Sequence, residues 1–106
     1  MPEPQLSPIP VRVVKNLDRE RYELFTDETP GEFIGFLAYQ VIDENTVELQ
    51  HTIISEDFSR RGFARTLVTQ VLDLIRTDGS SIVPTCSYVQ DYLERFPQYG
   101  DLVSRQ

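Results

Sequence analysis

Residues 55–68 read Ser55-Glu56-Asp57-Phe58-Ser59-Arg60-Arg61-Gly62-Phe63-Ala64-Arg65-Thr66-Leu67-Val68, and they join a strand-like apolar run to an amphipathic helix. Three of the ten basic residues of the chain fall between positions 60 and 65. The first backbone N–H groups of a helix have no partner within it and carry the positive end of its dipole, so a turn here predicts a phosphate site. The alternative is a plain helix start with solvated charges. The glycines and lysine of a Walker loop or a dinucleotide fingerprint are missing.

The segments on either side of this turn predict one domain of class α+β, with the order β-β-β-β-α-β-α. Apolar residues recur at helical spacing over 61–78, and Gly79 follows as a stop signal. Ser87 is expected to cap a last helix that Pro97 ends. The strand-like segments are 11–15, 21–26, 32–42, 46–54 and 81–84.

Two of these strands carry further expectations. The third, residues 32–42, is nearly continuously apolar, so we expect it to be central and covered on both faces. In the fourth, alternation predicts that the odd-numbered residues share one face. These residues are Val47, Leu49, His51 and Ile53.

Length and composition exclude several classes of protein. The 106 residues suit a single domain over 11–106, preceded by a flexible proline-rich segment, residues 1–10. A net charge of −7 argues against nucleic-acid binding. One cysteine and one histidine allow neither an intrachain disulfide nor a structural zinc site, so we expect no metal. Without a signal peptide or an apolar run long enough for a bilayer, we expect a cytoplasmic protein that does not contact membranes.

Three side chains are candidates for chemistry. His51 precedes the phosphate turn on a strand, and it is either a hydrogen-bonded core residue or a neutral base. Cys86 follows the fifth strand and precedes a helix, where a thiol is either a small buried hydrophobe or an activated nucleophile. Tyr88 is either a packing residue or a general acid.

The ordered set of motifs resembles the small members of the GNAT superfamily of acetyl-CoA-dependent N-acetyltransferases over roughly residues 11–103. The motifs are Glu48-Leu49-Gln50-His51-Thr52, Arg61-Gly62-Phe63-Ala64, Pro84-Thr85-Cys86-Ser87-Tyr88-Val89 and Phe96-Pro97-Gln98-Tyr99-Gly100. The resemblance implies a mixed, mostly antiparallel sheet whose fourth and fifth strands splay apart around pantetheine. It also implies acetyl transfer from acetyl-CoA to an unidentified amine, by a monomer or a weak homodimer.

The resemblance also assigns roles to residues. Ile53 and Ile54 are expected to offer backbone groups to pantetheine, and Arg60, Arg61, Gly62, Phe63 and Ala64 to hold the pyrophosphate. Arg65 and Thr66 are expected to add side-chain contacts. In the small subfamily the cysteine of the Pro-x-Cys segment is the suspected reactive residue, which indicates Cys86.

Two mechanisms are left open by these residues. In direct attack, His51 or a water takes a proton from the amine while Tyr88 or another donor protonates the leaving thiolate. In the other, Cys86 takes the acetyl group first.

The chain departs from the usual pattern of the superfamily at three points. Ser59 stands where the turn usually begins with Arg or Gln, and Arg60 stands where a Gly is usual. The two helices that most relatives insert after the first strand have no room between Val14 and Tyr22. A non-catalytic module that binds CoA or a protein partner is therefore the alternative function.

Overall fold

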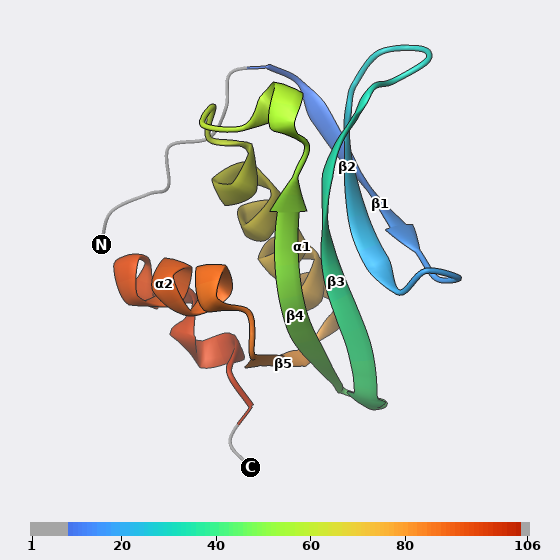
Figure 1. Ribbon diagram of the computed structural model, residues 1–106. Helices are drawn as coiled ribbons and strands as arrows, with labels where there is room; N and C mark the ends of the chain where they lie inside the picture. Colours follow the sequence, from blue (N-terminus) through green and yellow to red (C-terminus); the bar gives the residue numbers. More distant parts are fainter. Residues whose placement is uncertain (1–8, 105–106) are drawn as a thin grey trace.

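The computed structural model describes residues 9–104, which form one five-stranded sheet with two α-helices (Figure 1). The strands are β1 (Val11–Asn16), β2 (Arg21–Thr26), β3 (Phe33–Asp43), β4 (Thr46–Ile54) and β5 (Ser81–Pro84). The helices are α1 (Phe63–Asp78) and α2 (Ser87–Arg95), with short 3-10 turns η1 (Glu56–Phe58) and η2 (Pro97–Leu102). The predicted α+β class and element order are confirmed. The predicted cap at Ser87 is wrong, because Ser87 is already the first residue of α2 and Cys86 stands at the cap position. The predicted flexible segment lies mostly outside the described residues.

The sheet is mixed, as expected, with the spatial order β1-β2-β3-β4-β5. Successive hairpins make β1 to β4 antiparallel, whereas β5 returns after α1 and pairs parallel to β4. The chain passes from β1 to β2 through residues 17–20 alone, so the two inserted helices are absent. No helix among the described residues is long and apolar enough to cross a bilayer.

One face of the sheet packs on α1 and forms the core. Helix α1 contributes a buried apolar stripe, and the sheet and α2 supply the facing residues. The fully buried large side chains are Phe63, Leu24, Ile34, Leu37, Leu49, Leu67, Leu72, Ile75, Ile82, Val68, Val71 and Val89. This packing fixes the N-terminus of α1 beside the end of β4.

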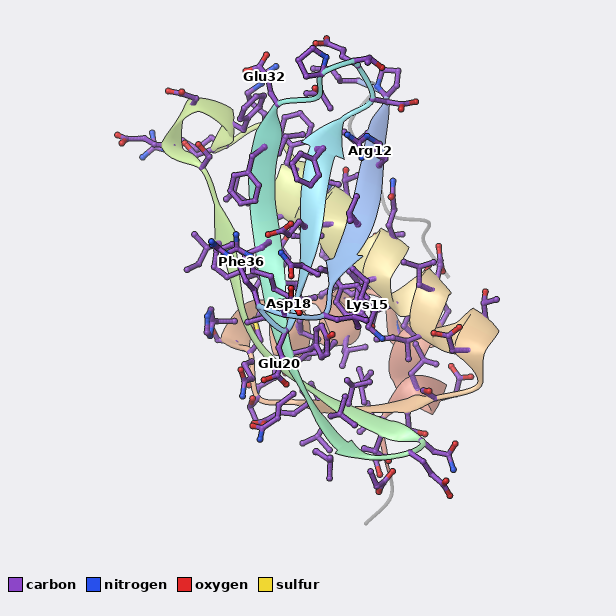
Figure 2. The ribbon with its side chains drawn as sticks, turned by 90° about the vertical axis from the view of Figure 1, so that its right-hand side faces the viewer. Arg12, Lys15, Asp18, Glu20, Glu32 and Phe36 are labelled. Atoms are coloured by element: carbon purple, nitrogen blue, oxygen red, sulfur yellow. The ribbon has the colours of Figure 1, made fainter. Side chains whose placement is uncertain are left out.

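The opposite face, here called the outer face, carries no helix among residues 9–104. Figure 2 looks onto it, with β1, β2 and β3 in front, the helices behind, and Phe36 and Arg12 labelled. Phe33 of β3 is 39% exposed, and Ile53, which pairs with Phe36 from β4, is 50% exposed. The expectation that β3 is covered on both faces is therefore wrong, because within residues 9–104 both α-helices pack on the other face of the sheet.

A β-bulge divides β4 into two halves. Ala38 pairs with His51 but Tyr39 pairs with Leu49, so one extra residue, Gln50, stands in β4. Paired residues share a face, which puts Thr52 beside Leu37 on the core face and leaves His51 on the outer face. The predicted single face for the odd-numbered residues is wrong beyond Leu49, because the extra residue reverses the alternation.

Strands β4 and β5 separate after four paired positions. Their pairing ends at Leu49 opposite Pro84, and β4 continues to Ile54 without β5 beside it (Figure 1). The N–H groups of Thr85 and Cys86 both donate to the Leu49 carbonyl, at 3.1 and 2.9 Å. This shared acceptor closes the base of the gap, and Pro84 marks the point where parallel pairing stops.

Candidate functional site

A cavity of about 280 Å³ lies at the open end of this gap, between the end of β4, the turn after it and the start of α2. It joins most of the predicted phosphate turn to one end of β4 and to Tyr88. Its lining residues are Ile54, Phe58, Ser59, Arg60, Gly62, Phe63, Ala64 and Tyr88.

The turn reaches the helix through two left-handed residues. Arg60 has φ +61° and Gly62 has φ +83°, and α1 starts at Phe63 rather than at the predicted Arg61. The left-handed region is sterically costly for an arginine and free for a glycine. These conformations bend the backbone so that the first N–H groups of α1 stand beside the cavity.

The start of α1 has an excess of positive charge. Its first turn holds no acidic residue and no side chain caps it, while Arg60, Arg61 and Arg65 surround it. Each cation near a helix N-terminus costs about 0.3–1 kcal/mol by its interaction with the dipole. A bound anion offsets this cost, so the local electrostatics favour a phosphate ligand.

Aromatic stacking holds Arg61 at the turn. Its guanidinium lies 5.5 Å from the Phe58 ring centroid and 5.4 Å from that of Phe63. Thr66, predicted to contact the cofactor, is buried, and its hydroxyl donates to the Gly62 carbonyl at 3.2 Å. Its side chain therefore supports the turn.

The exposed edge of β4 presents particular backbone groups to the gap. The Ser55 N–H donates to the Ile34 carbonyl of β3 at 2.7 Å. Because backbone groups alternate along a strand, those of Ile53 point to β3 as well, and those of Thr52 and Ile54 point into the gap. Of the two residues predicted to offer backbone to pantetheine, Ile54 has this orientation, and Thr52 shares it.

Cys86 lies at the base of the gap and is 4% exposed. Its Sγ is 3.4 Å from Thr52 Oγ1, and either atom can be the donor. Sequence reasoning did not select Thr52, because the bulge that turns it toward Cys86 has no signal in the local residue types.

His51 is on the other side of β4 from this pair. Its ring is exposed and lies 6.0 Å from the Phe36 ring, nearly perpendicular to it. It borders a groove of about 430 Å³ on the outer face, lined by Arg19, Glu20, Arg21, Phe36, Ala38, Tyr39, Gln40, Gln50 and His51. The structure therefore does not join His51 and Cys86 into a nucleophile–base pair.

Tyr88 stands at the mouth of the gap and is 36% exposed. Burial raises the pKa of its phenol, while the guanidinium groups of Arg65 and Arg95 act in the opposite direction. The phenol is therefore protonated at neutral pH and able to donate a proton.

Comparisons with known proteins agree with this architecture. The sequence model of the GCN5-related N-acetyltransferase family matches residues 21–102. Protein NATD1 of Xenopus tropicalis is 34% identical over 65 residues, which are 59% of this chain and 60% of that protein. Protein NATD1 of Mus musculus is 27% identical over 92 residues, covering 85% of this chain and 82% of the mouse protein.

Among solved structures, the NMR structure of a GCN5-like protein from Staphylococcus aureus superposes with a TM-score of 0.64. The two share 20% identity over 90% of this chain and 89% of the other, a level that speaks for the fold alone. Strands β4 and β5 of the mixed sheet separate beside the start of α1, and the family model matches most of the chain. Together these two findings define the class of the protein. The protein belongs to the GCN5-related N-acetyltransferase family.

Proposed function

We propose that the protein binds acetyl-CoA in the gap between β4 and β5 and transfers the acetyl group to an amine. The observation that carries this proposal is the cavity that joins the left-handed turn, the free edge of β4 and Tyr88. A pyrophosphate on the N–H groups of residues 62–64, with Arg60 beside it, suits the positive helix end. The backbone groups of Thr52 and Ile54 suit the two amides of pantetheine.

The acceptor amine is assigned to the groove on the outer face. His51 borders this groove, and its β4 neighbour Thr52 faces the gap, so a substrate in each cavity reaches the same segment of β4. The amine nitrogen attacks the thioester carbonyl carbon, a C–N bond forms and the C–S bond breaks. His51 or a water takes the amine proton, and Tyr88 is the proposed donor to the leaving thiolate.

Direct attack is the proposed route. In the route through Cys86, a thiolate attacks the same carbonyl carbon and releases the CoA thiolate before the amine arrives. The burial of Cys86 against Thr52 limits the approach of a thioester to Sγ, which supports direct transfer.

Titration with acetyl-CoA tests the binding part of the proposal. At a ligand concentration of 100 times Kd, unfolding should cost about 2.7 kcal/mol more, which thermal unfolding detects readily. A melting temperature unchanged by saturating acetyl-CoA would reject the proposal.

A non-catalytic binding module is the second candidate, supported by the open outer face, where Phe33 and Ile53 are 39% and 50% exposed. Release of free CoA thiol in the presence of a panel of amines separates the two. Stabilisation by acetyl-CoA without turnover on any amine would favour the module.

A further inference from the structure

The first strand, β1, forms one edge of the sheet. Strand β2 pairs with one side of it, and no strand in the described part of the chain pairs with the other. The Asp27 N–H donates to the Pro10 carbonyl at 3.0 Å, which identifies the backbone groups that face β2. Since backbone groups alternate along a strand, those of Val11, Val13 and Lys15 point away from the sheet. Three N–H groups and three carbonyls are therefore directed outward along this edge.

The two cations of β1 do not guard this edge. Proteins often protect a free strand with charged side chains that hinder the pairing of another strand. Here Lys15 Nζ lies 5.6 Å from the ring centroid of Tyr22 and 5.2 Å from that of Tyr39. The Arg12 guanidinium lies 5.1 Å from the ring centroid of Phe25. These rings belong to β2 and β3, so both charges are held over the sheet and leave the edge accessible (Figure 2).

Helix α1 provides an apolar surface beside the same edge. A groove of about 290 Å³ is lined by Val13 of β1 and by Gln70, Asp73, Leu74 and Thr77 of α1. Leu74 is 44% exposed and does not belong to the buried stripe of α1. Figure 2 shows α1 extending beyond β1 at the rim of the sheet. A strand added to β1 would therefore lie over the helix and cover Leu74.

The sequence of β1 fits a second copy of itself in one register. In an antiparallel pair centred on Val13, position 13 pairs with itself and position 11 pairs with position 15 at both ends. All the outward groups are then used, in three pairs that each exchange two hydrogen bonds. Arg12 stands opposite Val14 and Lys15 opposite Val11, so no two cations are directly opposed. A shift of two residues in either direction loses one of the three pairs, and one of these shifts places Arg12 opposite itself.

We infer that two copies of the chain pair through β1 about a two-fold axis at Val13, which joins two five-stranded sheets into one. The axis is perpendicular to the sheet, so both α1 helices lie on the same side of it. Val13 and Leu74 of the two copies then form one apolar cluster, which an unrelated extended peptide would not reproduce. Such self-complementary pairing is the commonest symmetry of homo-oligomers. The dimer does not depend on acetyl-CoA, because β1 and the gap beside β4 lie toward opposite edges of the sheet.

Sedimentation equilibrium from micromolar to millimolar concentration tests the pairing. The unaltered chain should shift from 12.3 kDa toward twice that mass as its concentration rises. Val13→Pro should remain a monomer, because it removes an outward N–H at the axis and none that faces β2. Leu74→Lys should weaken the dimer at least about tenfold, since it places two like charges beside the axis. Ile42→Lys is the matched control, because Ile42 is 46% exposed but lies on β3, and it should leave association unchanged.

Cross-linking tests the register. In the Cys86→Ala background, Val13→Cys should form a disulfide-linked dimer on mild oxidation, because the paired Cα atoms would stand about 5.5 Å apart. Ile42→Cys in the same background should not. A mass of 12.3 kDa at every concentration would overturn the dimer, and so would a dimer that both Val13→Pro and Leu74→Lys leave unchanged. If Val13→Pro does not fold, the comparison of Leu74→Lys with Ile42→Lys decides.

Discussion

Thr52 Oγ1 lies 3.4 Å from Cys86 Sγ and joins the half of β4 that has no β5 beside it to the segment that follows β5. The contact spans 34 positions of sequence and sits where the two strands separate. The contact helps to hold Cys86 at the base of the gap, away from the cavity that Ile54, Gly62 and Tyr88 line.

Cys86→Ala is expected to retain most of the transfer activity, because direct attack needs no thiol. Loss of a small buried side chain should lower the free energy of unfolding by about 1 kcal/mol. Initial rates below the unfolding transition, with mass spectrometry of the protein after incubation with acetyl-CoA alone, check this. An acetyl adduct on the peptide containing Cys86, together with an inactive Cys86→Ala variant, would contradict direct transfer.

Gly62→Ala should weaken CoA binding and lower stability by about 1–2 kcal/mol, since an alanine at φ +83° is strained. Gly79→Ala is the matched control at the other end of α1. Gly79 has φ +74°, and at both glycines a Cβ meets no atom within 4 Å, so strain is the shared effect. Gly79→Ala should show a similar stability loss with unchanged affinity for CoA. Equal losses of affinity in both variants would mean that the turn has no special role in binding.

Arg60→Gly should change stability and affinity in opposite directions. Relief of the left-handed strain gains about 1–2 kcal/mol, and the entropy of the glycine offsets about 0.5–1 kcal/mol of it. The lost charge should weaken CoA binding several-fold. Chemical denaturation and calorimetry measure the two effects, and tighter CoA binding by the glycine variant would remove Arg60 from the phosphate site.

His51→Ala should lower kcat by about 100-fold if the imidazole is the base, within the usual range of general-base catalysis. Stability should change by less than about 0.5 kcal/mol because the side chain is exposed. Gln50→Ala, at a neighbouring groove position, serves as the control for a general disturbance of the bulge. A full kcat in the His51 variant would assign proton removal to water.

Stability should fall as the pH rises from about 10 to 12. Burial raises the pKa of Tyr22 to about 12 from an ordinary value of 10.0, so the folded state favours the neutral phenol. This contribution, about 2–3 kcal/mol, is fully present below pH 10 and is lost as the pH approaches the folded-state pKa. Tyr22→Phe should flatten the alkaline limb of the stability curve. If the stability of the Tyr22→Phe variant fell just as steeply over this pH range, the loss would be due to other tyrosines.

The element order and the position of the turn before α1 could be predicted from sequence, since both depend on local hydrophobic periodicity and on glycine and proline residues. The apolar spacing from Phe63 to Ile75 and the glycine at position 79 leave little choice for α1. The partner of Cys86 could not be predicted, because it depends on a register shift created by pairing with β3. The predicted face of the His51 side chain was wrong for the same reason. The exact start of α1 depended on backbone conformations at Arg60 and Gly62.

Because of the bulge at Gln50, the number of residues between Leu49 and Thr52 determines which face of the sheet each later residue of β4 occupies. A substitution at Gln50 alters one side chain, whereas deleting that residue restores strict alternation and exchanges the two sides for every residue from His51 to Ile54. His51 and Ile53 would then point at α1, and Thr52 would point to solvent. At this site the number of residues matters more than the identity of any one of them, and variants that differ there in length should lose the whole arrangement at once.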